Sequence, residues 1–106
     1  MSGRLGAADL AATTNTLIYT VTSSTVATVS ISVCNRNVTG IVIRLAHLNG
    51  AIGTLANEDY IEYGHTICKN GVLERTGIVM AAGSTIVAYS DTANVSVQVY
   101  GWEESV

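Results

Sequence analysis

The chain has 106 residues, which is enough for one domain and too few for two. Only 12% of them are charged, against about 25% in an average globular chain, so small polar and apolar groups must form most of the surface. The five cationic residues are scattered and the formal net charge is −3. Nucleic-acid binding needs a basic stripe, so this composition argues against a nucleic-acid partner.

The sequence also predicts no membrane-spanning segment. No apolar run approaches the about 18 residues that a membrane span requires. The N-terminus has one Arg and no apolar core of the kind found in signal peptides. We therefore expect a protein that is made in the cytoplasm and has no membrane partner.

Residues 1–14 are rich in Gly, Ala and Thr and show no clear period. We expect them to form an extended N-terminal arm, followed by one domain over residues 15–106. Either the chain's own domain or a neighbouring subunit would hold this arm. Arg4 and Leu5 are its candidate contact residues.

From Thr16 onward the dominant pattern is an alternation of apolar and polar residues. The segment 17–21 predicts a short strand, and "TVATVSISVC" over 25–34 predicts a half-buried strand with its apolar side chains on one face. The segment "IVIRLAHL" over 41–48 is apolar on both faces apart from two residues. It predicts a central strand that is covered on both sides.

The second half of the chain continues the pattern. "YIEY" over 60–63, "TIVAYS" over 85–90 and "NVSVQVYGW" over 94–102 predict strands. "GVLERTGIVM" over 71–80 predicts a strand with a bulge or bend at Gly77. Turn signals separate the strands at intervals of about ten residues, which indicates an all-β fold with a single antiparallel sandwich of about 7–8 strands, either immunoglobulin-like or jelly-roll.

The stretch "DYIEYGHTICKNGVLERTG" over 59–77 holds most of the reactive side chains. Glu58, Asp59 and Glu62 could act as acid and base, with His65 nearby and Cys68 as nucleophile. Strand parity places Glu62 on the same face as Tyr60 and opposite the face of Ile61 and Tyr63. No third group orients a base, and no recognised metal spacing is present.

We therefore predict no catalytic residue, no metal and no cofactor, and read the stretch as two strands and their connection. Glu62, Glu74 and Arg75 remain as candidate partner contacts. The two cysteines, Cys34 and Cys68, form no recognisable zinc motif. Reduced structural thiols are the first expectation and a disulfide is the alternative.

Tyr100 and Trp102 are expected on the outward face of the last strand. Exposed aromatic residues beside polar groups bind protein partners or sugars. For Tyr100 and Trp102 we first expect a contact with another subunit or with the N-terminal arm. The alternative is a sugar-binding platform that also includes Tyr60 and Tyr63.

Several pieces of the sequence resemble, in this order, a family of small structural proteins from tailed bacteriophages. They are "YTV", "VCNR", "IRLA", "YIEY", "TGIVM" and "NVSVQVYGWEE", and the likeness covers Leu17 to Glu104. The resemblance implies a β-sandwich on the virion, as a head decoration, neck, or tail and fibre-associated component, commonly in trimers. It also implies that catalysis and cofactors are absent.

Composition and resemblance together lead to one expected function. The chain is expected to be a virion structural protein, first of all a capsid decoration (cement) protein that binds between subunits of the major capsid protein. The alternative is a neck, tail or fibre-associated adaptor, or a glycan-binding adhesin module. The expected contact residues are Arg4, Leu5, Glu62, Glu74, Arg75, Tyr100 and Trp102.

Overall fold

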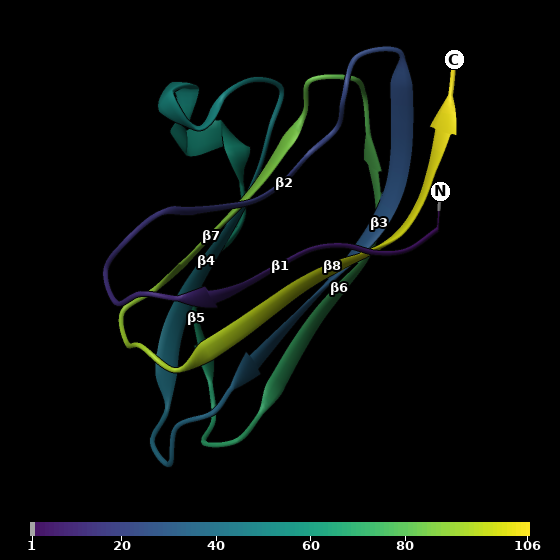
Figure 1. Ribbon diagram of the computed structural model, residues 1–106. Helices are drawn as coiled ribbons and strands as arrows, with labels where there is room; N and C mark the ends of the chain where they lie inside the picture. Colours follow the sequence, from purple (N-terminus) through teal and green to yellow (C-terminus); the bar gives the residue numbers. More distant parts are fainter. Residues whose placement is uncertain (1) are drawn as a thin grey trace.

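The computed structural model describes residues 2–106 and contains eight strands and two short 3-10 turns (Figure 1). The strands are β1 (Ser2–Leu10), β2 (Thr16–Thr20), β3 (Thr25–Asn35), β4 (Ile41–Leu48), β5 (Tyr60–Ile67), β6 (Val72–Met80), β7 (Thr85–Ser90) and β8 (Val95–Ser105). The 3-10 turns η1 (Ile52–Thr54) and η2 (Asn57–Asp59) lie between β4 and β5.

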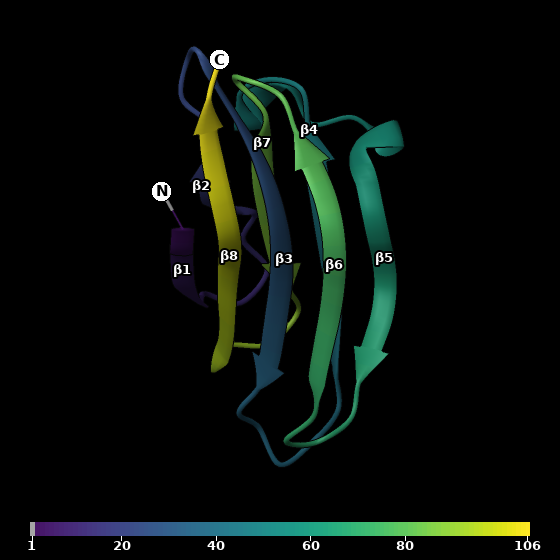
Figure 2. The same cartoon turned by 90° about the vertical axis from the view of Figure 1, so that its right-hand side faces the viewer.

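The strands form two four-stranded antiparallel sheets that pack face to face (Figure 2). Sheet A has the order β1-β8-β3-β6 and sheet B has the order β2-β7-β4-β5. The pairs β1–β8, β2–β7, β3–β6 and β4–β5 are those of one long hairpin rolled onto itself. This confirms the predicted sandwich and makes it a jelly roll rather than an immunoglobulin-like fold.

The core lies between the sheets and follows from the alternation in the sequence. The inward side chains of β3 and β8 are almost fully buried, as their period of two predicted. They are Ala27, Val29, Ile31 and Val33 on β3, and Val95, Val97 and Val99 on β8. Inward residues of β2, β4 and β7 cover them from the other sheet.

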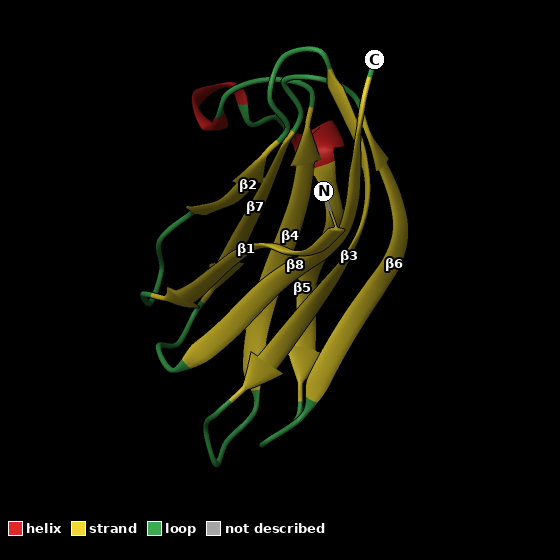
Figure 3. Ribbon diagram, turned by 45° about the vertical axis from the view of Figure 1, so that its right-hand side comes forward, coloured by secondary structure: helices red, strands yellow, loops and turns green. Residues whose placement is uncertain are grey.

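A second, smaller apolar cluster lies on the outer face of sheet B. Ala46 and Leu48 of β4 and Val87 of β7 are buried there, under side chains of residues 49–60. The 3-10 turns in this segment sit over the end of the sheet in Figure 3. The predicted central position of strand 41–48 is confirmed, and its outer face is covered at Ala46 and Leu48, whereas Val42 and Arg44 on the same face stay partly exposed.

Every edge strand has an irregular register, whereas the central pairs β3–β8 and β4–β7 run without a break. In β6, Thr76 and Gly77 lie opposite the single residue Ser30 of β3. Gly77 has a φ of 72°, a value that glycine adopts readily. The bulge predicted at Gly77 is confirmed.

The N-terminal segment for which we expected an arm contains β1, an edge strand of sheet A hydrogen-bonded to β8. It passes so close to β2 that a Cβ atom at Gly6 would lie 2.3 Å from the Ile18 carbonyl oxygen. Asp9 of β1 also forms an ion pair with Arg36 of the β3–β4 turn. The domain itself therefore holds residues 2–10.

Asn35 ties together the loops at one end of the sandwich. It is fully buried, and its side-chain amide donates to the carbonyl oxygens of Thr39, Ile67 and Cys68 at 3.0–3.2 Å. Its Oδ1 accepts from the backbone and side-chain amides of Asn37. A buried amide whose groups are all bonded stabilises one loop arrangement, which gives the "CNRN" piece a structural role.

Candidate functional site

The charged stretch 59–77 forms the open edge of the sandwich, because β5 and β6 are edge strands of different sheets. Glu62 of β5 reaches Arg75 of β6, with 3.3 Å between Oε2 and the guanidinium nitrogen. His65 Nδ1 lies 3.9 Å from the other carboxylate oxygen of Glu62. These residues join the two sheets, which is a structural use of the most conspicuous charges in the chain.

The predicted parity of β5 is wrong. Ile61 and Gly64 have no partner in β4, and the shifts that they cause place Tyr60 and Tyr63 together on the outer face. Glu62 pairs with the core residue Leu45 and faces inward, with its side chain 19% exposed. A bulge reverses the alternation that sequence parity assumes.

The other candidates for chemistry in this stretch are dispersed. Asp59 accepts a hydrogen bond from the Ala56 amide at 2.8 Å. Cys68 is exposed at the β5–β6 turn. Both Cys34 and Cys68 are free thiols. Among residues 2–106, no group of three or more His, Cys, Asp or Glu side chains is placed to hold a metal ion.

The outer face of sheet A consists of side chains in regular rows across the strands. One row runs from Val79 on β6 through Thr28 and Trp102 to Ser2 on β1. Trp102 is 50% exposed and Val79 is 72% exposed. Next to it lies the row of Ser30, Tyr100 and Arg4, followed by the row of Glu74, Ser32, Gln98 and Ala7.

A hydrogen bond between side chains crosses this face. Tyr100 Oη donates to Glu74 Oε2 at 2.8 Å, across the intervening strand β3. This hydrogen bond, which stabilises the protonated phenol next to a carboxylate, raises the pKa of Tyr100. In the interior, burial and a hydrogen bond to Glu103 raise the pKa of Tyr19.

The outer face of sheet B is different in kind. The Arg44 guanidinium lies between two aromatic rings, 4.5 Å from the centroid of Tyr63 and 4.5 Å from that of Tyr89. Tyr60 meets Tyr63 edge to face, with 4.9 Å between the ring centroids. Cation–π and aromatic contacts hold these side chains in one arrangement. We call Arg44, Tyr60, Tyr63 and Tyr89 the tyrosine–arginine cluster.

A hollow adjoins this cluster. It has a volume of about 440 Å³ and is lined by Asn57, Tyr60 and Tyr63. Tyr63 is 64% exposed, so its ring is available to a partner. Sequence reasoning missed Arg44 and Tyr89. Their shared outward parity was a usable signal, but the pairing of β4 with β7 was not known.

The structure divides the predicted contact residues among three places. Arg4, Glu74, Tyr100 and Trp102 share the outer face of sheet A. Leu5 is partly buried against the core, and Glu62 and Arg75 bind each other at the open edge.

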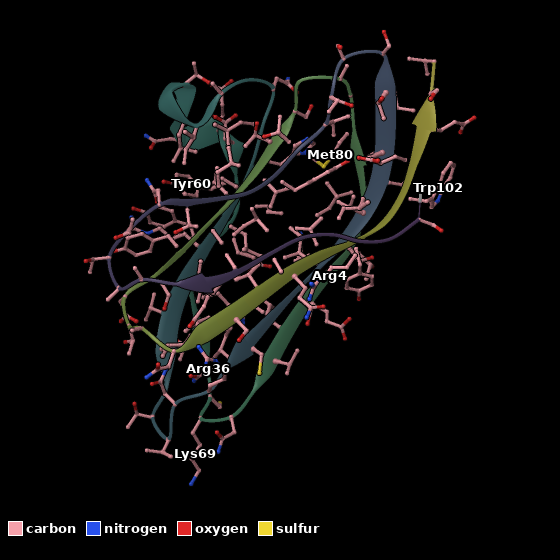
Figure 4. The ribbon with its side chains drawn as sticks, viewed as in Figure 1. Arg4, Arg36, Tyr60, Lys69, Met80 and Trp102 are labelled. Carbon is pink, nitrogen blue, oxygen red and sulfur yellow. The ribbon has the colours of Figure 1, made fainter. Side chains whose placement is uncertain are left out.

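The sugar platform suggested for four aromatic residues is divided as well. Tyr60 and Tyr63 lie on sheet B, whereas Tyr100 and Trp102 lie on sheet A. Figure 4 shows Tyr60 and Trp102 on opposite sides of the molecule. A single ligand surface cannot include all four rings.

No helix within residues 2–106 has the length and apolar character needed to cross a membrane. Comparisons with protein-family models, with curated proteins and with solved structures gave no match to this chain. The geometry of the two outer faces is therefore the basis for a functional assignment.

Proposed function

We propose that the chain is a non-catalytic structural protein of a tailed-bacteriophage virion, most specifically a decoration protein that binds between capsid subunits. The observation that carries the proposal is the outer face of sheet A, where Trp102 and Val79 are exposed in one row among short hydroxyl side chains. Such a face has a low desolvation cost and an aromatic anchor, both of which favour binding to a protein surface.

The decoration protein would act through buried area alone. Each apolar Å² removed from water contributes about 25 cal/mol, so a face that bridges neighbouring subunits adds cohesion to the shell. The expected partner is the major capsid protein, and the chain itself is expected to assemble as a trimer. Jelly rolls serve in viral capsid and lectin domains, which is a fold-level analogy in support of this class.

The alternative is a neck, tail or fibre-associated component that acts as an adaptor or glycan-binding module. The hollow beside Tyr60 and Tyr63 favours this alternative, because a concave aromatic surface is typical of small-ligand sites. Its position on sheet B leaves the face of sheet A free for attachment to the particle.

Mass spectrometry of purified particles tests the proposal directly. We expect the chain in the particles at many copies, and its presence only in the cytosol of infected cells would rule the proposal out. Trp102→Ala should then reduce binding to particles that lack the protein by at least about tenfold, as expected for an anchor residue. Tyr63→Ala on the opposite face is the matched control and should leave this binding unchanged.

A further inference from the structure

The tyrosine–arginine cluster has a cation without a counter-charge. Within residues 2–106 the ion pairs of arginine involve Arg36 and Arg75, and the Arg44 guanidinium makes neither an ion pair nor a hydrogen bond. Two neighbouring carboxylates are already bound to backbone amides, Asp59 to Ala56 and Asp91 to Val42. The charge of Arg44 is therefore available to a ligand.

The two aromatic contacts also restrict the Arg44 side chain. Its guanidinium lies over the rings of Tyr63 and Tyr89, and within residues 2–106 its N–H donors make no hydrogen bond to the protein. The N–H donors of a guanidinium form a fixed fork that matches the two oxygens of a carboxylate. Holding the fork in advance reduces the conformational entropy that is lost on binding.

The hollow next to the cluster suits a sugar ring. Its volume of about 440 Å³ and its wall of two tyrosines and Asn57 combine an apolar surface with an amide donor and acceptor. The C–H face of a pyranose packs on an exposed aromatic ring such as Tyr63, and its hydroxyls can bond Asn57.

From these observations we propose that the outer face of sheet B binds a saccharide that bears a carboxylate, such as a uronic acid. The pyranose packs against Tyr60 and Tyr63 in the hollow, and its carboxylate reaches past the edge of the Tyr63 ring to pair with the Arg44 guanidinium. This inference deepens the glycan-binding alternative and rests on it, but it does not require the chain to decorate a capsid.

Titration of the full chain with matched oligosaccharides, followed by calorimetry and NMR, provides the test. A uronic-acid oligosaccharide should bind at least about tenfold more tightly than its neutral hexose counterpart, because hydrogen bonds to a charged group are the stronger ones. Its affinity should fall as salt is added. Absence of binding, or equal binding of the neutral oligosaccharide, would overturn the proposal.

Variants separate the roles of the residues. Arg44→Lys keeps the charge but lacks the fork, so it should lose most of the preference for the acidic sugar. Tyr63→Ala should weaken both oligosaccharides, and Trp102→Ala on sheet A should change neither. Circular dichroism of each variant shows that it is folded.

An acidic peptide serves as the competing ligand. If a Glu-rich peptide bound as tightly as the uronic acid, the cluster would be a protein-docking site and the saccharide assignment would be wrong. Because the sugar titration uses the isolated chain and particle binding depends on Trp102, failure of one proposal is distinguishable from failure of the other.

Discussion

The outer face of sheet A carries exposed side chains in rows that are regular across β3 and β8, whereas the outer face of sheet B is partly covered by residues 49–60 and carries aromatic rings around Arg44. Both faces belong to four-stranded sheets of the same jelly roll. The covering arises from the long connection between β4 and β5, since this segment folds back over its own sheet. The aromatic rings around Arg44 come from the neighbouring strands β5 and β7. One sandwich thus presents one face of exposed strand side chains and one face with a covering segment and a hollow. Each face suits a different kind of partner.

The largest expected effect comes from the second apolar cluster, on the outer face of sheet B. Leu48 is 1% exposed, and Leu48→Ala should lower the free energy of unfolding by about 3 kcal/mol because it leaves a cavity under residues 49–60. Urea denaturation measures this change. On sheet A the exposed Val79 offers the matched control, and Val79→Ala should stay within about 0.5 kcal/mol. Similar losses for both variants would mean that the faces do not differ in this way.

A smaller effect is expected from the stacked cation. Arg44→Gln removes two cation–π contacts and should cost about 1–1.5 kcal/mol of stability. Arg4→Gln on the outer face of sheet A is the matched substitution, with an expected change of less than about 0.5 kcal/mol. Thermal unfolding of the two variants in parallel measures the difference, and a loss for Arg4→Gln as large as that for Arg44→Gln would contradict the comparison.

The smallest effect concerns the hydrogen bond between Tyr100 and Glu74 on the outer face of sheet A. Glu74→Ala removes the acceptor of the Tyr100 hydroxyl, so the pKa of Tyr100 should fall toward its ordinary value of about 10. NMR of isotope-labelled tyrosine rings follows this phenol separately from the others. An unchanged pKa in Glu74→Ala would show that the contact does not form in solution.

The hydrogen bond of Tyr100 and the buried contact of Tyr19 make the stability of the fold depend on pH. The folded pKa of Tyr100 is raised above the unfolded value, as is that of Tyr19. Stability from these phenols is therefore fully present below about pH 10 and is lost as the pH rises through the folded pKa values. A denaturation series into the alkaline range should show this decline, and Glu74→Ala should reduce it.

Local patterns were sufficient to predict much of the fold. The alternation in β3 and β8 identified their inward residues, because side-chain direction within a regular strand depends only on the strand itself. The bulge at Gly77 could be predicted because glycine weakens a regular strand and is favoured where the strand bends. The two possible sandwich topologies could not be separated, since strand order depends on pairings between residues far apart in the sequence.

The candidate site was predicted less well for the same reason. Parity placed Glu62 and Tyr63 on the wrong faces, because the shifts at Ile61 and Gly64 depend on how β5 pairs with β4. Glu62 and Arg75 were expected to contact a partner, but they meet each other once β5 and β6 lie at the same edge. The stack of Tyr63, Arg44 and Tyr89 joins three strands and has no signature in any one of them.

The irregular edge strands affect how copies of this protein associate at high concentration. A long flat edge with free amides and carbonyls recruits further strands and leads to fibrils. Here the register breaks at β1, β2, β5 and β6, while the interior pairs stay regular. Such edges are poor templates for strand addition. Crowded copies should therefore meet through their faces, which permits dense packing in one layer without aggregation.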